Sequence, residues 1–176
     1  MLTMKKYLIF LLALGLQAGM SLPDYFRANF EQTVRSDDHN ATLRYKGKLR
    51  FHAPDNARWD YETPVEKSIC VQNARVWVIE PELEQATLFR LRQSIPLNTL
   101  VARAKPQKDG SYLSRFEGVD YHLQADTRGR PVTISYTDHL GNRVRIRFFH
   151  IETDPFDTRT LACRIPEGFD VIDGRY

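Results

Sequence analysis

The chain has 176 residues, a length that suits one domain. Its formal net charge is +3, and it falls to +1 if the stretch with Lys5 and Lys6 is removed as a leader. A balance this close to neutral gives no strong phosphate-seeking field, so we expect no nucleic-acid partner. Ten Phe, eight Tyr and two Trp make the apolar content aromatic, which favours strands over helices.

The first residues have the pattern of a secretory signal. Lys5 and Lys6 are followed by a ten-residue apolar run, residues 7–16, which is too short to span a bilayer as a helix. Small residues follow, and they allow cleavage near Ala18 or near Ser21. The alternative is an uncleaved anchor. No Cys follows the apolar run, so we expect no lipid attachment there.

We therefore expect residues 1–21 to be a signal peptide and residues 22–176 to form one exported domain. No second long apolar run is present.

Apolar and polar residues alternate with a period of two along most of the chain, which is typical of half-buried strands. The first such segment is 26–35, and the clearest is 43–52, where every second residue is basic or His. Residues 58–62 continue the pattern with Trp59 and Tyr61 on one face.

The middle of the chain contains a hairpin and one helical segment. Residues 67–71 and 75–79 flank a predicted turn at 72–74, and residues 85–91 are compatible with a short strand. In residues 94–104 the spacing changes: Leu97, Leu100 and Val101 fall on one face of a short helix that Pro96 can begin. We expect residues 105–110 to be a polar loop.

Alternation returns after this loop, in residues 112–116, 119–125, 132–137 and 143–148, and a last strand is expected near 160–165. Helices do not alternate with strands, so a parallel sheet is not expected. A meander this long must curl to cover its apolar face. The sequence thus predicts a mainly β protein, an antiparallel barrel or half-barrel of about 9–11 strands with one short helix.

Three other features bear on metal binding, catalysis or modification. Cys70 and Cys163 have no metal-ligand spacing, and the sequence leaves open whether they pair. The five His are scattered and no HExxH, G-x-S-x-G or P-loop pattern occurs, so we expect no enzyme, no metal and no cofactor. Asn40 lies in a motif, Asp38 to Thr42, that resembles a bacterial N-glycosylation acceptor; a chance match is the alternative.

Two basic stripes are expected to be solvated outer faces, with contact to an anionic membrane surface or an acidic partner as the alternative. Their members are Arg44, Lys46, Lys48, Arg50, Arg143, Arg145 and Arg147.

Several segments, taken in order, resemble the LolA family of lipoprotein carriers, and the likeness covers nearly all of the chain after the leader. No single motif is specific, but their order and spacing are. The segments are the F-x-x-x-F-x-Q pattern at Phe26, Phe30 and Gln32; Gly47-Lys48-Leu49 before Pro54; Trp59, Tyr61 and Pro64; residues 76–81, 84–87 and 96–103; and residues 165–172.

The resemblance implies an incomplete, strongly curved antiparallel β-barrel with a short helical lid. It also implies a monomeric periplasmic carrier that binds the acyl chains of lipoproteins. Such a carrier receives them from an inner-membrane Lol-type ABC transporter and delivers them to an outer-membrane acceptor, LolB-like or of another kind. The alternative is a periplasmic module that senses lipids or peptides on the same half-barrel.

The expected cavity lining consists of aromatic and aliphatic residues on the inward face of the strands and on the lid. For any one of them, simple core filling is the alternative. They are Phe30, Leu49, Phe51, Trp59, Tyr61, Trp77, Leu88, Leu97, Leu100 and Val101.

One departure from the family pattern concerns the lid. The family has an Arg before the Pro of the turn that follows the Gly-x-Leu strand, and this Arg latches the lid. The corresponding residue here is Ala53. The latch is therefore expected elsewhere, for instance on Arg58, or is absent.

Overall fold

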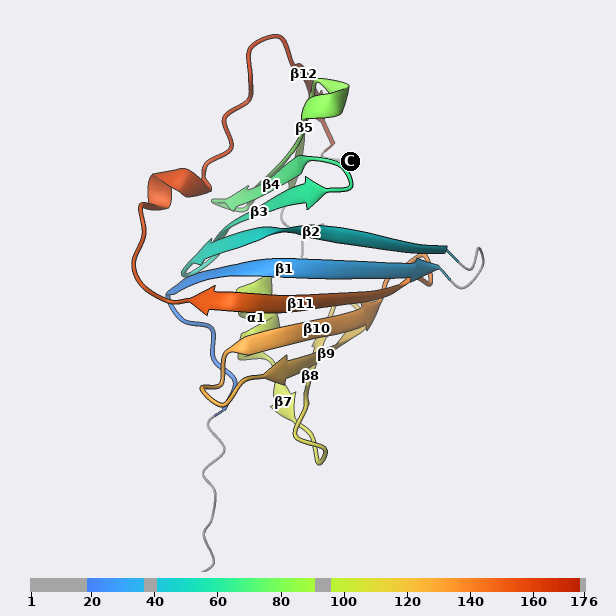
Figure 1. The fold of residues 1–176 in the computed structure, drawn as a ribbon, viewed down its shortest axis with the longest axis vertical. Coiled ribbons are helices and arrows are strands. Elements are labelled where there is room, and N and C mark those ends of the chain that lie inside the picture. Colours follow the sequence, from blue (N-terminus) through green and yellow to red (C-terminus); the bar gives the residue numbers. More distant parts are fainter. Residues whose placement is uncertain (1–18, 37–40, 91–95, 175–176) are drawn as a thin grey trace, which may run out of the picture.

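The computed structural model describes residues 19–36, 41–90 and 96–174, which form one open, curved sheet of twelve strands (Figure 1). Asn40 of the glycosylation motif and most of the expected leader lie outside these residues. The strands are β1 Tyr25–Ser36, β2 Ala41–His52, β3 Asn56–Thr63, β4 Lys67–Gln72, β5 Arg75–Glu80, β6 Gln85–Arg90, β7 Lys105–Pro106, β8 Tyr112–Phe116, β9 Val119–Ala125, β10 Pro131–Thr137, β11 Arg143–Glu152 and β12 Asp170–Asp173.

The sheet has the order β12-β6-β5-β4-β3-β2-β1-β11-β10-β9-β8-β7, and its two edges do not meet. All neighbours are antiparallel except β12, which lies parallel to β6. The predicted mainly β, incomplete and curved barrel is confirmed.

Two details of the prediction were wrong. Residues 160–165 are not a strand: a 3-10 helix, η3 (Thr158–Leu161), occupies part of that stretch and the last strand begins only at Asp170. The expected polar loop at 105–110 opens with the two-residue strand β7.

The long strands β1 and β2 are the centre of the sheet. They pair without a register shift from Tyr25 opposite His52 to Ser36 opposite Ala41. Register shifts occur instead where β1 meets β11, β2 meets β3 and β9 meets β10. Irregularities of this kind bend the bulged strand and increase its twist, which helps to curl the sheet around one face.

That inner, concave face carries the core. Phe30 is fully buried and lies opposite Gly47 on β2. A Cβ on Gly47 would lie 2.0 Å from the Asp60 carbonyl oxygen and 2.8 Å from the Phe30 ring. Only glycine therefore lets the Phe30 ring lie against β2 here. It also lets β3 approach β2 closely at this point.

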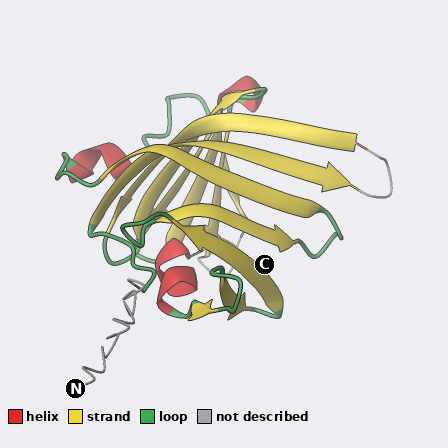
Figure 2. Ribbon diagram, turned by 60° about the horizontal axis from the view of Figure 1, so that its bottom comes forward, coloured by secondary structure: helices red, strands yellow, loops and turns green. Residues whose placement is uncertain are grey.

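The predicted helix is present as α1 (Leu97–Ala102), and it lies on the concave side of the sheet (Figure 2). Leu97, Leu100 and Val101 are all buried, as their spacing predicted. They pack in one cluster with Phe51 and Trp59 of the sheet.

The outer, convex face is crossed by the C-terminal strap, residues 153–169, which joins β11 to β12 and contains η3 (Figure 1). Cys163 of the strap forms a disulfide with Cys70 on β4, with a Cα–Cα distance of 5.7 Å. The bond explains how the strap is fixed to the sheet before the chain reaches the β6 edge.

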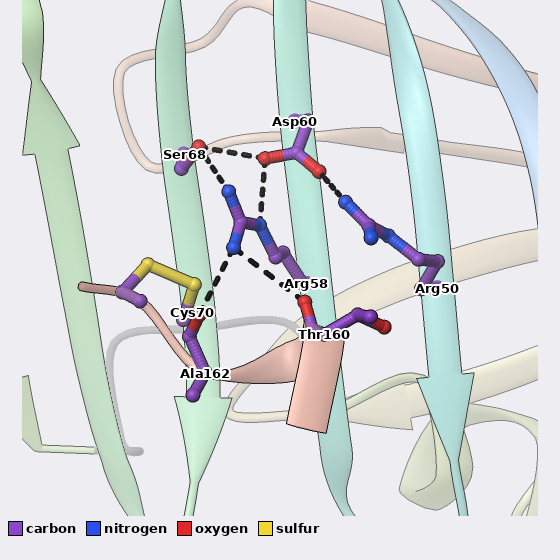
Figure 3. Close-up of a disulfide and its surroundings, with 8 residues drawn as sticks. Arg50, Arg58, Asp60, Ser68, Cys70, Thr160 and Ala162 are labelled. Atoms are coloured by element: carbon purple, nitrogen blue, oxygen red, sulfur yellow. Dashed lines mark hydrogen bonds and ion pairs between the residues drawn. A yellow bond between two sulfur atoms is a disulfide. The ribbon is translucent and has the colours of Figure 1, made fainter. Parts of the chain in front are cut away.

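Ionic hydrogen bonds support the same attachment (Figure 3). Arg58 donates to Asp60 at 2.8 Å and to the Ala162 carbonyl oxygen at 2.9 Å, and Arg50 also pairs with Asp60. Burial alone would raise the pKa of Asp60, but hydrogen bonds from Ser68, Arg58 and Arg50 outweigh it and hold the pKa below its usual value. Asp60 is therefore a carboxylate that binds two arginines and, through Arg58, the strap.

Removing the disulfide should destabilise the protein because it closes a loop across a separation of 93 residues. We expect the double variant Cys70→Ser/Cys163→Ser to lose about 3–5 kcal/mol of unfolding free energy, measured by urea denaturation. Reductant should shift the wild-type curve in the same direction and leave the variant unchanged. A variant as stable as the wild type would show that the ion pairs alone hold the strap.

Candidate functional site

A hollow of about 440 Å³ opens in the concave face, beside the part of the core that α1 covers. This volume lies within the range of roughly 300–1,000 Å³ found for small-molecule sites. Its walls are almost entirely apolar or aromatic. The lining residues are Gln32, Trp59, Tyr61, Ile69, Val71, Val76, Val78, Phe89, Tyr136 and Ile146.

Strand register brings these side chains together. On one wall, Trp59 lies opposite Ile69, and Ile69 lies opposite Val78 on the next strand. On the other wall, Gln32 lies opposite Ile146 of β11. Directly opposite residues project from the same face of a sheet, so these five strands aim one surface, apolar except for Gln32, into the hollow.

Edge-to-face aromatic contacts hold the Phe30 ring against Trp59 and Tyr61, two residues of this surface. Phe30 packs against Trp59 with ring centroids 5.3 Å apart and against Tyr61 at 5.0 Å. Tyr45 packs on the outer side of Tyr61 at 5.7 Å. These contacts favour one orientation of each ring.

The hollow carries no ionised group in its lining at neutral pH. Burial, reinforced by Tyr136 and Tyr45, raises the pKa of Tyr61 far above its usual value, and burial with Tyr121 raises the pKa of Tyr136 to about 12. The Tyr61 hydroxyl donates a hydrogen bond to Gln32 Oε1 at 2.8 Å. A hydrocarbon chain entering the hollow would thus meet no charge that needs water.

The rim of the hollow is more polar. Lys67, opposite Tyr61 on β4, places its ammonium 4.6 Å from the centroid of the Tyr61 ring and 5.5 Å from that of Tyr45. Leu43, on the same face of β2 as Tyr45, is 52% exposed. The concave face therefore continues outward past the hollow as an exposed apolar surface with one cation beside it.

A second, much smaller void of about 20 Å³ lies between α1 and the sheet. Trp59 and Val71 line both spaces, and Leu97 closes the smaller one. The six-residue helix is tied to the β2–β3 turn by a hydrogen bond from Asn98 Nδ2 to Asp55 Oδ1 at 3.3 Å. A helix this short buries little area, so it can be displaced at low cost, and its displacement would open the smaller void.

Arg58 does not latch this helix. It lies on the convex face, where it binds Asp60 and the strap, and Ala53 makes a backbone hydrogen bond to the Asp24 carbonyl oxygen at 2.8 Å. The expectation that Arg58 replaces the family's latch was therefore wrong. Among the described residues, the side-chain hydrogen bond from the helix to the β2–β3 turn comes from Asn98.

The ten residues expected to line the cavity fall into four groups. Trp59 and Tyr61 line the hollow. Phe30, Leu49 and Phe51 are fully buried beneath and beside it. Leu97, Leu100 and Val101 form the buried face of α1. Trp77 and Leu88 do not line the hollow: they lie opposite each other and alternate with Val76, Val78 and Phe89, which do.

Sequence reasoning missed eight of the lining residues, although most were visible as strand positions. The position of Val76 and Val78 depends on the β4–β5 turn, which has two residues, Asn73 and Ala74, and not the three expected. With a two-residue turn, Val71 pairs with Val76. A three-residue turn would instead have placed Trp77 on the inner face.

No group of three or more His, Cys, Asp or Glu that could hold a metal ion occurs in residues 19–36, 41–90 and 96–174. Within the same residues, no helix has the length and apolar character needed to cross a bilayer.

Comparisons of sequence point to one family. The model of the family described as "Outer membrane lipoprotein carrier protein LolA" matches residues 24–117. A protein named outer-membrane lipoprotein carrier protein from Wolinella succinogenes is 34% identical, over 89% of this chain and 90% of its own length. A protein of the same name from Campylobacter jejuni is 27% identical over 96% of this chain and 98% of its own.

Solved structures agree with the fold. A LolA superfamily protein from Nitrosomonas europaea superposes with a TM-score of 0.51 at 12% identity, covering 82% of this chain and 92% of that one. An uncharacterized conserved protein from Thermus thermophilus gives a TM-score of 0.54 at 10% identity over 86% of this chain and 91% of that one.

Proposed function

Because the chain belongs to the LolA family of outer-membrane lipoprotein carriers, we propose that it carries lipoproteins across the periplasm with their acyl chains in the hollow of the concave face. It takes them from an inner-membrane Lol-type ABC transporter and delivers them to an outer-membrane acceptor. Its work is binding and release, without catalysis. The observation that supports this role best is the hollow in the concave face, whose lining carries no charge.

The energetics of transfer require such a hollow. Burying one CH₂ is worth roughly 0.8 kcal/mol, so an acyl chain of about fifteen methylenes resists exposure to water by on the order of 12 kcal/mol. The side chains of Ile69, Val76 and Val78 offer a dry surface without hydrogen-bonding demands. Because these contacts are non-directional, they can hold chains of different lengths and still release them.

The position of α1 next to the hollow supports loading and release. The helix rests on Trp59 and Val71, which also line the hollow. Displacement of the helix would extend the apolar surface under Phe51 and Ala57, and its return would reduce the surface again. We propose that entry of the cargo displaces α1 and that its return helps to expel the chains at the acceptor.

Two features of the chain fit a periplasmic location. The first residues have a secretory signal pattern, and disulfides such as Cys70–Cys163 persist in oxidising compartments.

A variant that fills the hollow should abolish cargo binding. Val78→Trp adds a large ring to its wall, and we expect at least a tenfold loss of affinity for a dipalmitoylated lipopeptide, measured by fluorescence titration. Thr137→Trp is the matched control, because it adds the same ring to an exposed position that adjoins the lining residue Tyr136.

Thermal melting of both variants must show that they fold. If Val78→Trp is folded and binds the lipopeptide as tightly as Thr137→Trp does, the chains are held somewhere else and the proposal fails.

Contacts before β1 favour one of the two cleavage sites. The Ser21 backbone N–H donates to the Gly129 carbonyl oxygen at 2.9 Å, and Met20 and Leu22 pack against the core. Cleavage after Ser21 would remove Met20 and this hydrogen bond, so we expect the mature protein to begin at Gly19. Intact-mass measurement on protein from the periplasm tests this; a mass that begins at Leu22 would contradict it.

A further inference from the structure

Gln32 is the one lining residue of the hollow with a polar side chain that is not an aromatic ring. Its Oε1 accepts the hydrogen bond from the Tyr61 hydroxyl at 2.8 Å. In the part of the chain that the structure describes, its Nε2 has no hydrogen-bond partner. Two N–H donors of this side chain therefore face a space whose other walls are apolar or aromatic.

The position of the amide is well defined. β1 places Gln32 opposite Tyr45 on one side and Ile146 on the other. Tyr61, which fixes its oxygen, is held by ring contacts with Phe30 and Tyr45. The Tyr61 hydroxyl stays protonated at neutral pH, so it can donate continuously to Oε1. The amide plane is thus oriented before any ligand arrives.

Filling the hollow with bare hydrocarbon would leave these donors without water or any other partner. A buried donor that loses its partner costs free energy, whereas one that gains a neutral acceptor contributes favourably. A ligand that fits the hollow should therefore carry an acceptor near one end of its chain. An acyl group does so, because its carbonyl oxygen adjoins the hydrocarbon.

We infer that the Gln32 side-chain amide is a subsite for the carbonyl oxygen of an ester- or amide-linked acyl group. This inference rests on the proposed function and adds to it a reason to prefer acylated cargo over other hydrocarbon chains. Donation from Nε2 to the carbonyl also sets how far the chain enters, since the carbonyl stops beside β1 while the methylenes run toward Ile69 and Val78.

The test compares two probes that differ only in the carbonyl: a dipalmitoyl-glyceryl cysteine lipopeptide and its dihexadecyl ether analogue. We expect the wild type to bind the ester about five- to tenfold more tightly than the ether, which corresponds to one neutral hydrogen bond. In Gln32→Met, which keeps the length and loses the donors, the ratio should fall below about twofold, because the ester loses its hydrogen bond and the ether no longer leaves two donors unpaired. An amide-linked palmitoyl probe compared with its hexadecyl ether analogue tests the second linkage.

Because the ester-to-ether ratio is measured within each variant, a general change in folding or cavity volume cancels. Gln32→Leu provides a second replacement without donors, and it should give the same low ratio. Thr137→Val is the control, because it removes a polar group from an exposed position that adjoins the lining without belonging to it; it should keep the wild-type ratio.

Equal affinity of the wild type for ester and ether would overturn the inference and leave the carrier function standing. A ratio that survives in both Gln32 variants, or that is lost in Thr137→Val instead, would also overturn it. If neither probe binds the wild type, the proposed function fails together with the inference.

Discussion

The structure depends on a mismatch between the apolar area of a curved sheet and the size of the element that covers it. The sheet curves around one concave side, and the helix that packs against this side has six residues. The helix completes a dry core with Phe30, Phe51 and Trp59, but it reaches only part of the face. The uncovered part is the hollow between Trp59, Val78 and Ile146.

Such a hollow can persist because the elements that hold the sheet together lie elsewhere. The long pairing of β1 with β2 and β11 fixes the middle, and on the convex face the strap is fixed by Cys70–Cys163 and by the Arg58 and Asp60 ion pair. The disulfide and the ion pair do not involve the lining of the hollow. α1 itself is attached mainly by three buried side chains and one hydrogen bond to Asp55. In the proposed function, these convex-face attachments hold the sheet while the concave hollow takes the cargo, and α1 is the element that would move.

Much of the fold could be predicted because period-two alternation is a direct record of which side chains the strand buries. It indicated β1 and β2 correctly, and helical spacing did the same for the α1 face at Leu97, Leu100 and Val101. It did not fix which face Trp77 takes, because that depends on a two-residue turn in which Ala74, not Gly, has a positive φ of 61°. The strap was missed since its attachment is long-range: a disulfide and carbonyl oxygens bound by Arg58. Whether the interior is filled or hollow depends on three-dimensional packing, and no local pattern encodes it.

The central claim is that acyl chains occupy the concave hollow and not another surface. The most direct measurement is a set of intermolecular NOEs between the acyl chain of a bound lipopeptide and methyl groups of the protein, because an NOE reports direct contact. The account predicts NOEs to Ile69, Val78 and Ile146 and none to Leu88, which lies on the other face of β6 from Phe89. NOEs to Leu88 with none to the methyls of the hollow would contradict it.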